Sequence, residues 1–295
     1  MREGGAGLKK LLILSGKGGT GKTTITSAFI RLMSAEAFAD CDVDAPNLHL
    51  VVKQKTAPEI NDYFGMGKAE IDTEKCTYCG LCKRNCRFNA ILSIDSVYKV
   101  DAFSCEACGV CEAICPSGAI KVKPAVAGDL LLYNDNDTAF STAKLRMGSG
   151  TSGKLVTEVK KQLYKAKNDA DIAIIDGSPG IGCPVIASIS GVDLVLIVAE
   201  PSISGISDMK RIVETAQKFG VKTAVCINKY DTNTENTAKI EKICEVHELP
   251  FAGRIPFDTN VIKLLNMNKS IIDTQCEATE AIKSVYEKTM RILRG

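Results

Sequence analysis

Residues 11–24 read LLILSGKGGTGKTT. The four apolar residues at the start predict a buried strand of a parallel sheet, and the glycines that follow predict a loop. Apolar residues then recur at roughly helical spacing from Ile25 to Leu32, which indicates a helix. We therefore expect a strand, a glycine-rich loop and a helix in immediate succession.

The loop has the spacing of a phosphate-binding site. Residues 16–23 match G-x-x-x-x-G-K-[ST], a pattern in which backbone N–H groups surround phosphates, the lysine contacts the outer phosphates and the hydroxyl binds Mg²⁺. The start of the helix adds the positive end of its dipole. A glycine-rich turn without a ligand is the alternative, which the flanking strand and helix disfavour. The expected nucleotide-binding residues are Gly16, Gly18, Gly19, Thr20, Gly21, Lys22, Thr23 and Thr24.

Composition narrows the classes of function. Of the 295 residues 45% are hydrophobic and 24% are charged, as in folded globular proteins. A net charge of +2 without a block of basic residues argues against nucleic acid as a partner. No apolar run approaches the length of a membrane span and no export signal is recognised, so we expect no membrane association and a cytoplasmic location.

Thirteen cysteines are the unusual feature of the composition. Because the cytoplasm keeps thiols reduced, an odd number of cysteines there is not expected to form a disulfide framework. Metal or cluster binding is the better explanation.

Eight of these cysteines form two runs with the same spacing. Each run follows C-x2-C-x2-C-x3-C, and each cysteine of the second lies 29 positions after its counterpart, which indicates an internal duplication. The spacing is that of a bacterial-type ferredoxin with two 4Fe–4S clusters, in which the fourth cysteine of each run binds the other cluster. One cluster is expected on Cys76, Cys79, Cys82 and Cys115, and the second on Cys105, Cys108, Cys111 and Cys86.

Zinc is the alternative occupant of these cysteines. Zinc sites usually join two C-x2-C pairs over a longer gap, often with histidine. Here three cysteines lie close together in each run, and both histidines, His49 and His247, lie outside the segment. The spacing therefore favours iron–sulfur clusters. Arg87 follows Cys86 where the other run has a proline, and its charge is expected to raise the potential of that cluster.

Acidic residues follow two further strands. Asp40 and Asp42 lie at the end of a short apolar stretch, and Asp176 ends the run IAIID and is followed by GSPG. The carboxylate of Asp176 is expected to support the water shell of Mg²⁺. A solvated acidic turn is the alternative for Asp40 and Asp42. Strands and helices then alternate to residue 293, as a parallel sheet requires.

The loop sequence KGGTGKTT resembles the deviant Walker A loop of the MinD/ParA/Mrp superfamily, which includes the nitrogenase iron protein. The resemblance covers nearly the whole chain. It implies an α/β P-loop NTPase with a mostly parallel sheet flanked by helices, formed by residues 1–60 and 125–295. Residues 61–124 are then expected to form an inserted α+β ferredoxin domain.

The resemblance also implies roles for single residues. Lys17 is expected to reach the nucleotide of a second subunit across a homodimer, and Asp42 to orient the attacking water. The expected catalytic residues are Lys17, Lys22 and Asp42, and the expected Mg²⁺ site consists of Thr23, Asp40 and Asp176. Cys41, Asp44 and Cys183 receive no role.

The resemblance further implies how the nucleotide is read. Gly180 is expected to sense the γ-phosphate through its backbone. The sequence NKYD at residues 228–231 is similar to a guanine-reading motif, but in this superfamily the asparagine pairs with adenine and a later turn covers the base. Asn228 and Pro256 are therefore the expected contacts of the base, and ATP is favoured over GTP.

Three functions remain open on the sequence. The first is ATP-gated electron transfer from the 4Fe–4S clusters to a partner protein, as in the nitrogenase iron protein. The second is assembly of an iron–sulfur or other metal cofactor, as in Mrp-type proteins, with a cluster acceptor as the partner. The absence of a C-x-x-C pair outside the two runs weakens the second function. The third is an ATP-dependent binding switch without significant turnover.

Overall fold

The computed structural model describes residues 7–95, 97–266 and 270–295. Its main body is built on one nine-stranded sheet. In chain order the strands of this sheet are β1 (Lys9–Leu14), β2 (Ala37–Asp40), β3 (Glu59–Phe64), β8 (Val126–Asn134), β9 (Ala139–Leu145), β10 (Ile172–Asp176), β11 (Leu194–Ala199), β12 (Lys222–Asn228) and β13 (Phe251–Ile255).

The sheet is mostly parallel, with β1 and β10 near the middle of the strand order. The strand order is β13-β12-β11-β1-β10-β2-β9-β8-β3, and the strands from β13 to β9 run parallel to one another. Only the pairings of β8 with β9 and of β3 with β8 are antiparallel. Parallel strands place their carboxyl ends at one edge, so the loops after β1, β2, β10, β11 and β12 meet there.

Helices cover both faces of the sheet. One face carries α5 (Ser152–Ala166), α6 (Cys183–Ile189), α7 (Ile203–Lys218) and α8 (Thr234–Val246). The other carries α1 (Lys22–Met33), α2 (Leu48–Val51), α9 (Thr259–Asn266) and α10 (Glu277–Arg294). Two short 3₁₀ turns, η1 (Tyr230–Thr232) and η2 (Ile271–Asp273), complete this body. The expected α/β fold with a mostly parallel sheet between helices is confirmed.

Strand β1 shows why the sheet is buried on both sides. Leu12 and Leu14 pack into the hydrophobic cluster under α5 to α8, whereas Leu11 and Ile13 pack into the cluster under α1 and α10. Side chains alternate between the two faces of a strand, so a strand covered on both faces needs an uninterrupted apolar run. The sequence LLIL provides it.

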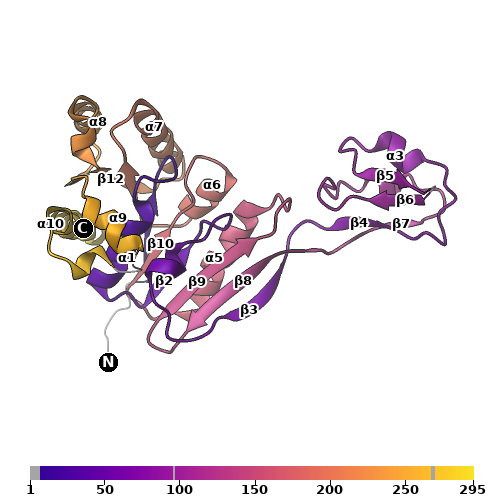
Figure 1. Cartoon of the computed structure of the whole chain (residues 1–295), viewed down its shortest axis with the longest axis horizontal. Coiled ribbons are helices and arrows are strands. Elements are labelled where there is room, and N and C mark those ends of the chain that lie inside the picture. Colours follow the sequence, from indigo (N-terminus) through magenta and orange to yellow (C-terminus); the bar gives the residue numbers. More distant parts are fainter. Residues whose placement is uncertain (1–6, 96, 267–269) are drawn as a thin grey trace.

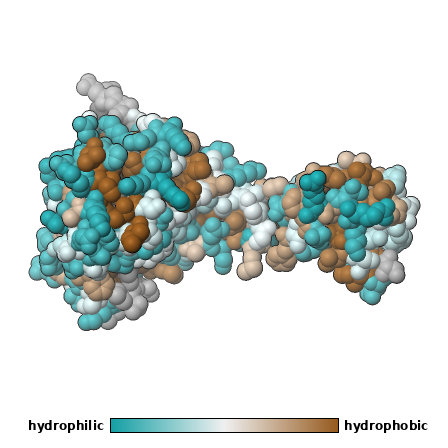
Figure 2. Space-filling model, turned by 90° about the horizontal axis from the view of Figure 1, so that it is seen from above, coloured by the Kyte–Doolittle hydropathy of each residue, from teal (hydrophilic) through white to brown (hydrophobic). Residues whose placement is uncertain are grey.

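A smaller unit projects from one edge of the main body (Figures 1 and 2). It contains β4 (Lys68–Ile71), α3 (Leu81–Asn85), β5 (Ile91–Ile94), β6 (Val97–Val100), α4 (Val110–Ala113) and β7 (Ile120–Lys123). Strand β4 pairs with β7 and β5 pairs with β6, both antiparallel. The unit has its own small hydrophobic cluster, to which Cys82 and Cys105 belong.

The chain enters and leaves this unit through the edge of the main sheet. The boundary expected between residues 60 and 61 falls inside β3, which pairs with β8 over residues 59–64 and thus belongs to the main sheet. The cysteine-rich unit extends from Lys68 to Lys123 in the structure. The loop between β9 and α5 lies against it, because a methyl group added to Gly148 would come within 2.9 Å of Cδ1 of Phe103.

Candidate functional site

The loop after β1 can turn tightly only because two of its residues are glycines. A Cβ atom at Gly16 would lie 2.1 Å from Cβ of Asp208, and one at Gly21 would lie 2.3 Å from Nδ2 of Asn228. Gly21 also has a positive φ of 89° and is the residue directly before α1. Side chains at these positions would displace α7 or Asn228, so the pattern of glycines is a packing requirement as well as a conformational one.

Asp176, at the carboxyl end of β10, collects three side-chain donors from α1. The ammonium of Lys22 lies 2.7 Å from Oδ1, and the two side chains are 6% and 0% exposed. The hydroxyl of Thr23 donates to Oδ2 at 2.8 Å, and that of Thr26 donates to Oδ1 at 2.8 Å. Three of the residues expected around the phosphates and Mg²⁺ are thereby brought together, and Thr26 joins them.

Asp40 is the second buried carboxylate of this edge. It accepts backbone N–H groups from Asp42 at 3.0 Å and from Asn47 and Leu48 at 2.9 Å each. Burial, and next the charge of Asp176, raise the pKa of Asp40, and the backbone donors only partly oppose this. A divalent cation nearby would favour the charged form of both carboxylates.

The half-buried Asp42 lies further out on the same loop. Burial raises the pKa of its carboxyl group, and the charge of Lys22 opposes that shift. The electrostatic effect of Lys22 thus extends to Asp42. Asp44, which received no role, is exposed.

The loop after β10 is tied to both neighbouring strands. Ser178 Oγ donates to the carbonyl of Cys41 at 2.6 Å. The N–H of Gly180, which was expected to sense the γ-phosphate, donates to the carbonyl of Ser15 at 3.1 Å. Gly180 has a positive φ of 96°. To face a phosphate, this N–H group would have to leave the carbonyl of Ser15.

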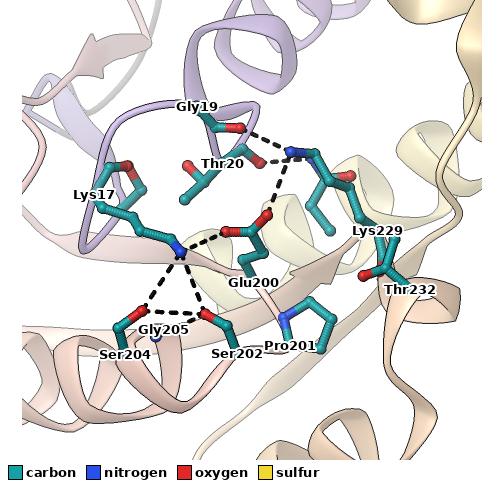
Figure 3. A network of polar contacts seen from close by, with 12 residues as sticks. Lys17, Gly19, Thr20, Glu200, Pro201, Ser202, Ser204, Gly205, Lys229 and Thr232 are labelled. Carbon is teal, nitrogen blue, oxygen red and sulfur yellow. Dashed lines mark hydrogen bonds and ion pairs between the residues drawn. The ribbon is translucent and has the colours of Figure 1, made fainter.

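Lys17 and Lys229 hold the tip of the phosphate loop through one glutamate (Figure 3). Lys17 Nζ lies 3.0 Å from Oε2 of Glu200, and Lys229 Nζ lies 3.4 Å from Oε1. Lys229 also donates to the carbonyl of Gly19 at 2.9 Å. Partial burial acts to raise the pKa of Glu200, but the hydrogen bond from Lys17 and the charge of Lys229 outweigh it, so the pKa is lowered.

A cavity of about 250 Å³ opens beside the loop, on the side of β12 and β13. Asn228 and Pro256, the two expected base contacts, both line it, as do Gly19 and Gly21. The amide of Asn228 donates to the carbonyl of Thr20 at 2.7 Å, so this residue also supports the loop. Within the part of the chain that the structure describes, the hydroxyl of Thr20 is buried without a hydrogen-bond partner.

Asp231 fixes the wall of this cavity. Its Oδ1 accepts the backbone N–H of Phe257 at 2.8 Å. This contact holds the 255–258 turn against the end of β12. In a guanine-reading motif the corresponding carboxylate would have to face the base, whereas here one of its oxygens is engaged with the backbone.

The cysteines of the small unit surround two separate cavities. One is lined by the first three cysteines of the first run and the last cysteine of the second: Cys76, Cys79, Cys82 and Cys115. The other is lined by Cys105, Cys108, Cys111 and Cys86. Among the described residues, no three His, Cys, Asp or Glu side chains converge as they would around one metal ion.

Comparison with known proteins places this geometry in a family. Residues 11–271 match the family described as the CobQ/CobB/MinD/ParA nucleotide binding domain. The chain belongs to this family. The expected kinship to MinD and ParA is confirmed.

Two relatives from Methanocaldococcus jannaschii and one solved structure illustrate the likeness. An uncharacterized protein is 35% identical over 294 residues, covering 95% of this chain and 96% of its own. An uncharacterized ATP-binding protein is 26% identical over 259 residues, which cover 86% of this chain and 76% of its own. The septum site-determining protein MinD of Pyrococcus horikoshii, solved with Mg-ADP, superimposes with a TM-score of 0.58 over 97% of both chains at 18% identity. Its fold is therefore shared.

Three residues of the site were not expected from the sequence. Thr26, Ser178 and Glu200 each make their contact with an element distant along the chain. Thr26 carried a weak signal, since it lies one helical turn after Lys22 and so on the same side of α1.

Among the described residues, no helix combines the length and apolar character needed to cross a membrane.

We expect Thr26→Val to lower the free energy of unfolding by about 1–2 kcal/mol more than Thr289→Val does, because a hydrogen bond to a charged group is the stronger one. Both threonines are fully buried in helices, and each hydroxyl lies within hydrogen-bond distance of the carbonyl four residues earlier. The single hydrogen of the Thr26 hydroxyl can instead be donated to the buried carboxylate of Asp176, which is as well placed as that carbonyl. Chemical denaturation of the two variants beside the wild type measures the difference. Equal losses would mean that Asp176 does not depend on this hydroxyl.

Proposed function

We propose that the chain couples ATP-driven switching of a homodimer to two 4Fe–4S clusters, and so gates electron transfer to a partner protein. The observation that carries the proposal is the crossed arrangement of the cysteines. Each cavity of the small unit is lined by three cysteines of one run and the fourth of the other. This is the pairing of a two-cluster ferredoxin.

The arrangement of the sulfur atoms favours clusters over zinc. A zinc ion draws four ligands to about 2.3 Å from one point, and the described residues contain no such group. In a 4Fe–4S cluster each cysteine binds a different iron, so the ligands stand around a cavity instead. Such clusters supply one-electron transfer at a potential set by nearby charges and hydrogen bonds. The N–H of Ala119 already lies 3.3 Å from the sulfur of Cys115.

The nucleotide-binding face supplies the other half of the proposal. The loop of residues 16–24 would hold the phosphates, and Thr23, Asp40 and Asp176 would surround Mg²⁺. Asp42 would orient the attacking water, because its half-buried carboxyl group lies on the loop whose backbone Asp40 holds at this edge of the sheet. Asn228 and Pro256 would contact adenine in the adjoining cavity.

Two close approaches lie between the two halves. Phe103, which lies two positions before Cys105, sits against Gly148 in the loop that leads into α5. At the start of α5, a Cβ on Gly153 would lie 3.1 Å from the carbonyl of Cys183, at the start of α6. Helix α6 directly follows the loop of Gly180. A change in that loop therefore has a short route to the second cysteine cavity.

Helix α5 is also fastened to the far end of α6. The buried ammonium of Lys160 donates to the carbonyls of Ala187 at 3.0 Å, Ser188 at 2.8 Å and Ser190 at 2.5 Å. A cation at this end of a helix complements the helix dipole. The two helices are thus joined at both ends and are expected to move as one piece.

We expect Lys22→Ala to abolish ATP hydrolysis and to leave the iron content unchanged. The lysine serves the phosphates on the main body, while the cysteines belong to a unit with its own hydrophobic cluster. Protein purified without oxygen is assayed for phosphate release and total iron, beside Lys239→Ala, which removes an exposed lysine of α8. Loss of iron together with turnover would contradict the separation of the two units.

We expect cysteine variants to fall into two spectroscopic classes that cross the two runs. Cys79→Ala and Cys115→Ala should remove the same cluster, and Cys108→Ala and Cys86→Ala the other. Each variant should keep about four of about eight iron atoms. Iron analysis and electron paramagnetic resonance of the reduced proteins measure this. Cys226→Ala, at a buried cysteine of β12, is the matched control and should keep all the iron.

Zinc in place of iron in the purified wild-type protein would contradict the assignment of 4Fe–4S clusters. So would a Cys115→Ala spectrum identical to that of Cys108→Ala, since both cysteines belong to the second run. To test the function itself, the reduced protein is mixed with methyl viologen or with an apo-ferredoxin, with and without ATP. ATP-dependent electron transfer to the first supports the proposal. Transfer of intact clusters to the second would instead favour cofactor assembly.

A further inference from the structure

Lys17 is bound inside its own subunit by three groups that lie between the end of β11 and the start of α7 (Figure 3). Its ammonium lies 3.0 Å from the Glu200 carboxylate, 3.3 Å from Ser202 Oγ and 3.5 Å from Ser204 Oγ. Ser202 Oγ in turn accepts the N–H of Gly205 and caps α7. The side chain of Lys17 is therefore directed along the loop of its own chain.

The acceptor groups are held more firmly than the lysine. Glu200 directly follows the fully buried strand β11. A Cβ on Gly205 would lie 2.3 Å from the carbonyl of Glu200, so the first turn of α7 packs on this residue. Lys17 has a long side chain that is 40% exposed, whereas that of Glu200 is 22% exposed. If the pair separates, the lysine is the partner that moves.

We propose that Glu200 is a positioning residue that retains Lys17 within its own subunit and releases it to the triphosphate of a second copy of this chain. The proposal rests on the proposed function, in which Lys17 reaches a nucleotide across a homodimer. A partly exposed ion pair is weak enough to be exchanged. A triphosphate with several negative charges is a stronger acceptor for an ammonium than one carboxylate.

Glu200 is suited to this role because Lys229 still partly neutralises its charge when Lys17 leaves. Its second oxygen stays within 3.4 Å of Lys229, which also holds the carbonyl of Gly19. The loop therefore keeps one of its two lysine contacts in either position of Lys17. One oxygen of the Glu200 carboxylate, Oε2, binds and releases Lys17. The other, Oε1, supports the loop through Lys229.

The test measures dimerisation with a non-hydrolysable ATP analogue and Mg²⁺. Sedimentation velocity over a dilution series gives the dimer dissociation constant for the wild type, Glu200→Gln, Lys17→Ala and the double variant. Glutamine keeps the size of the side chain but removes its charge. Because two Lys17–Glu200 pairs would open in each dimer, we expect Glu200→Gln to lower the dissociation constant about three- to tenfold.

A matched control separates this effect from the loss of any ion pair. Glu235→Gln removes the charge of an exposed glutamate that lies 2.7 Å from Lys239 on α8, and it should leave dimerisation unchanged. In the Lys17→Ala background, Glu200→Gln should have no effect on dimerisation. Binding of a fluorescent ATP analogue to dilute monomer is measured beside it, because it shows how far Glu200→Gln disturbs the loop through Lys229.

Three results would overturn the proposal. The first is weaker dimerisation in Glu200→Gln, and the second is an effect of equal size in both backgrounds, since either would mean that Glu200 does not act on dimerisation by retaining Lys17. The third is an unchanged dissociation constant. If the wild type does not dimerise with the analogue, or if Lys17→Ala dimerises equally well, the proposed function fails and the role of Glu200 fails with it.

Discussion

The buried carboxylate of Asp176 is the constraint on which the nucleotide-binding face depends. A charge removed from water is tolerated only when donors surround it, and removing one partner of such a pair costs about 3–5 kcal/mol. Its side-chain donors, Lys22, Thr23 and Thr26, all belong to the first turns of α1. They reach the carboxylate only if α1 begins beside the carboxyl end of β10. Satisfying this one charge therefore fixes the helix, and with it the loop that precedes it.

The same strand end also ties together the two acidic loops. The carbonyl of Asp176 accepts the N–H of Cys41 at 2.8 Å, and Ser178 Oγ returns a hydrogen bond to the carbonyl of Cys41. Asp40 is meanwhile committed to the backbone of its own loop. Asp42 and Gly180 are themselves held through their backbone N–H groups, by Asp40 and by the carbonyl of Ser15. A ligand that engages the N–H of Gly180 therefore has to displace the carbonyl of Ser15.

Local spacing predicted most of the fold and the groups of the site, whereas contacts between distant elements were out of its reach. The strand, loop and helix of residues 9–33 and the repeated cysteine runs are written in short stretches of sequence. Strand β3 was missed because its residues EINDYF are exposed except for Tyr63 and show no apolar pattern. Its place in the sheet comes from pairing with β8, far along the chain. Glu200 gave no signal for the same reason, since its partners Lys17 and Lys229 meet it only in the folded protein.

The separate cores of the two units decide what kind of coupling the protein can have. The small unit packs around its own apolar and cysteine side chains, so it does not need to deform when the main body changes. Besides the strands that join it to the sheet edge, the described residues place Phe103 near Gly148 and, more loosely, Glu106 near Gly150 of the main body. Gly148 has a positive φ of 76°, and its lack of a side chain lets the ring approach the backbone. In the proposed function, the small unit would therefore follow the position of the α5–α6 pair, and its orientation, not its internal structure, would change with the nucleotide.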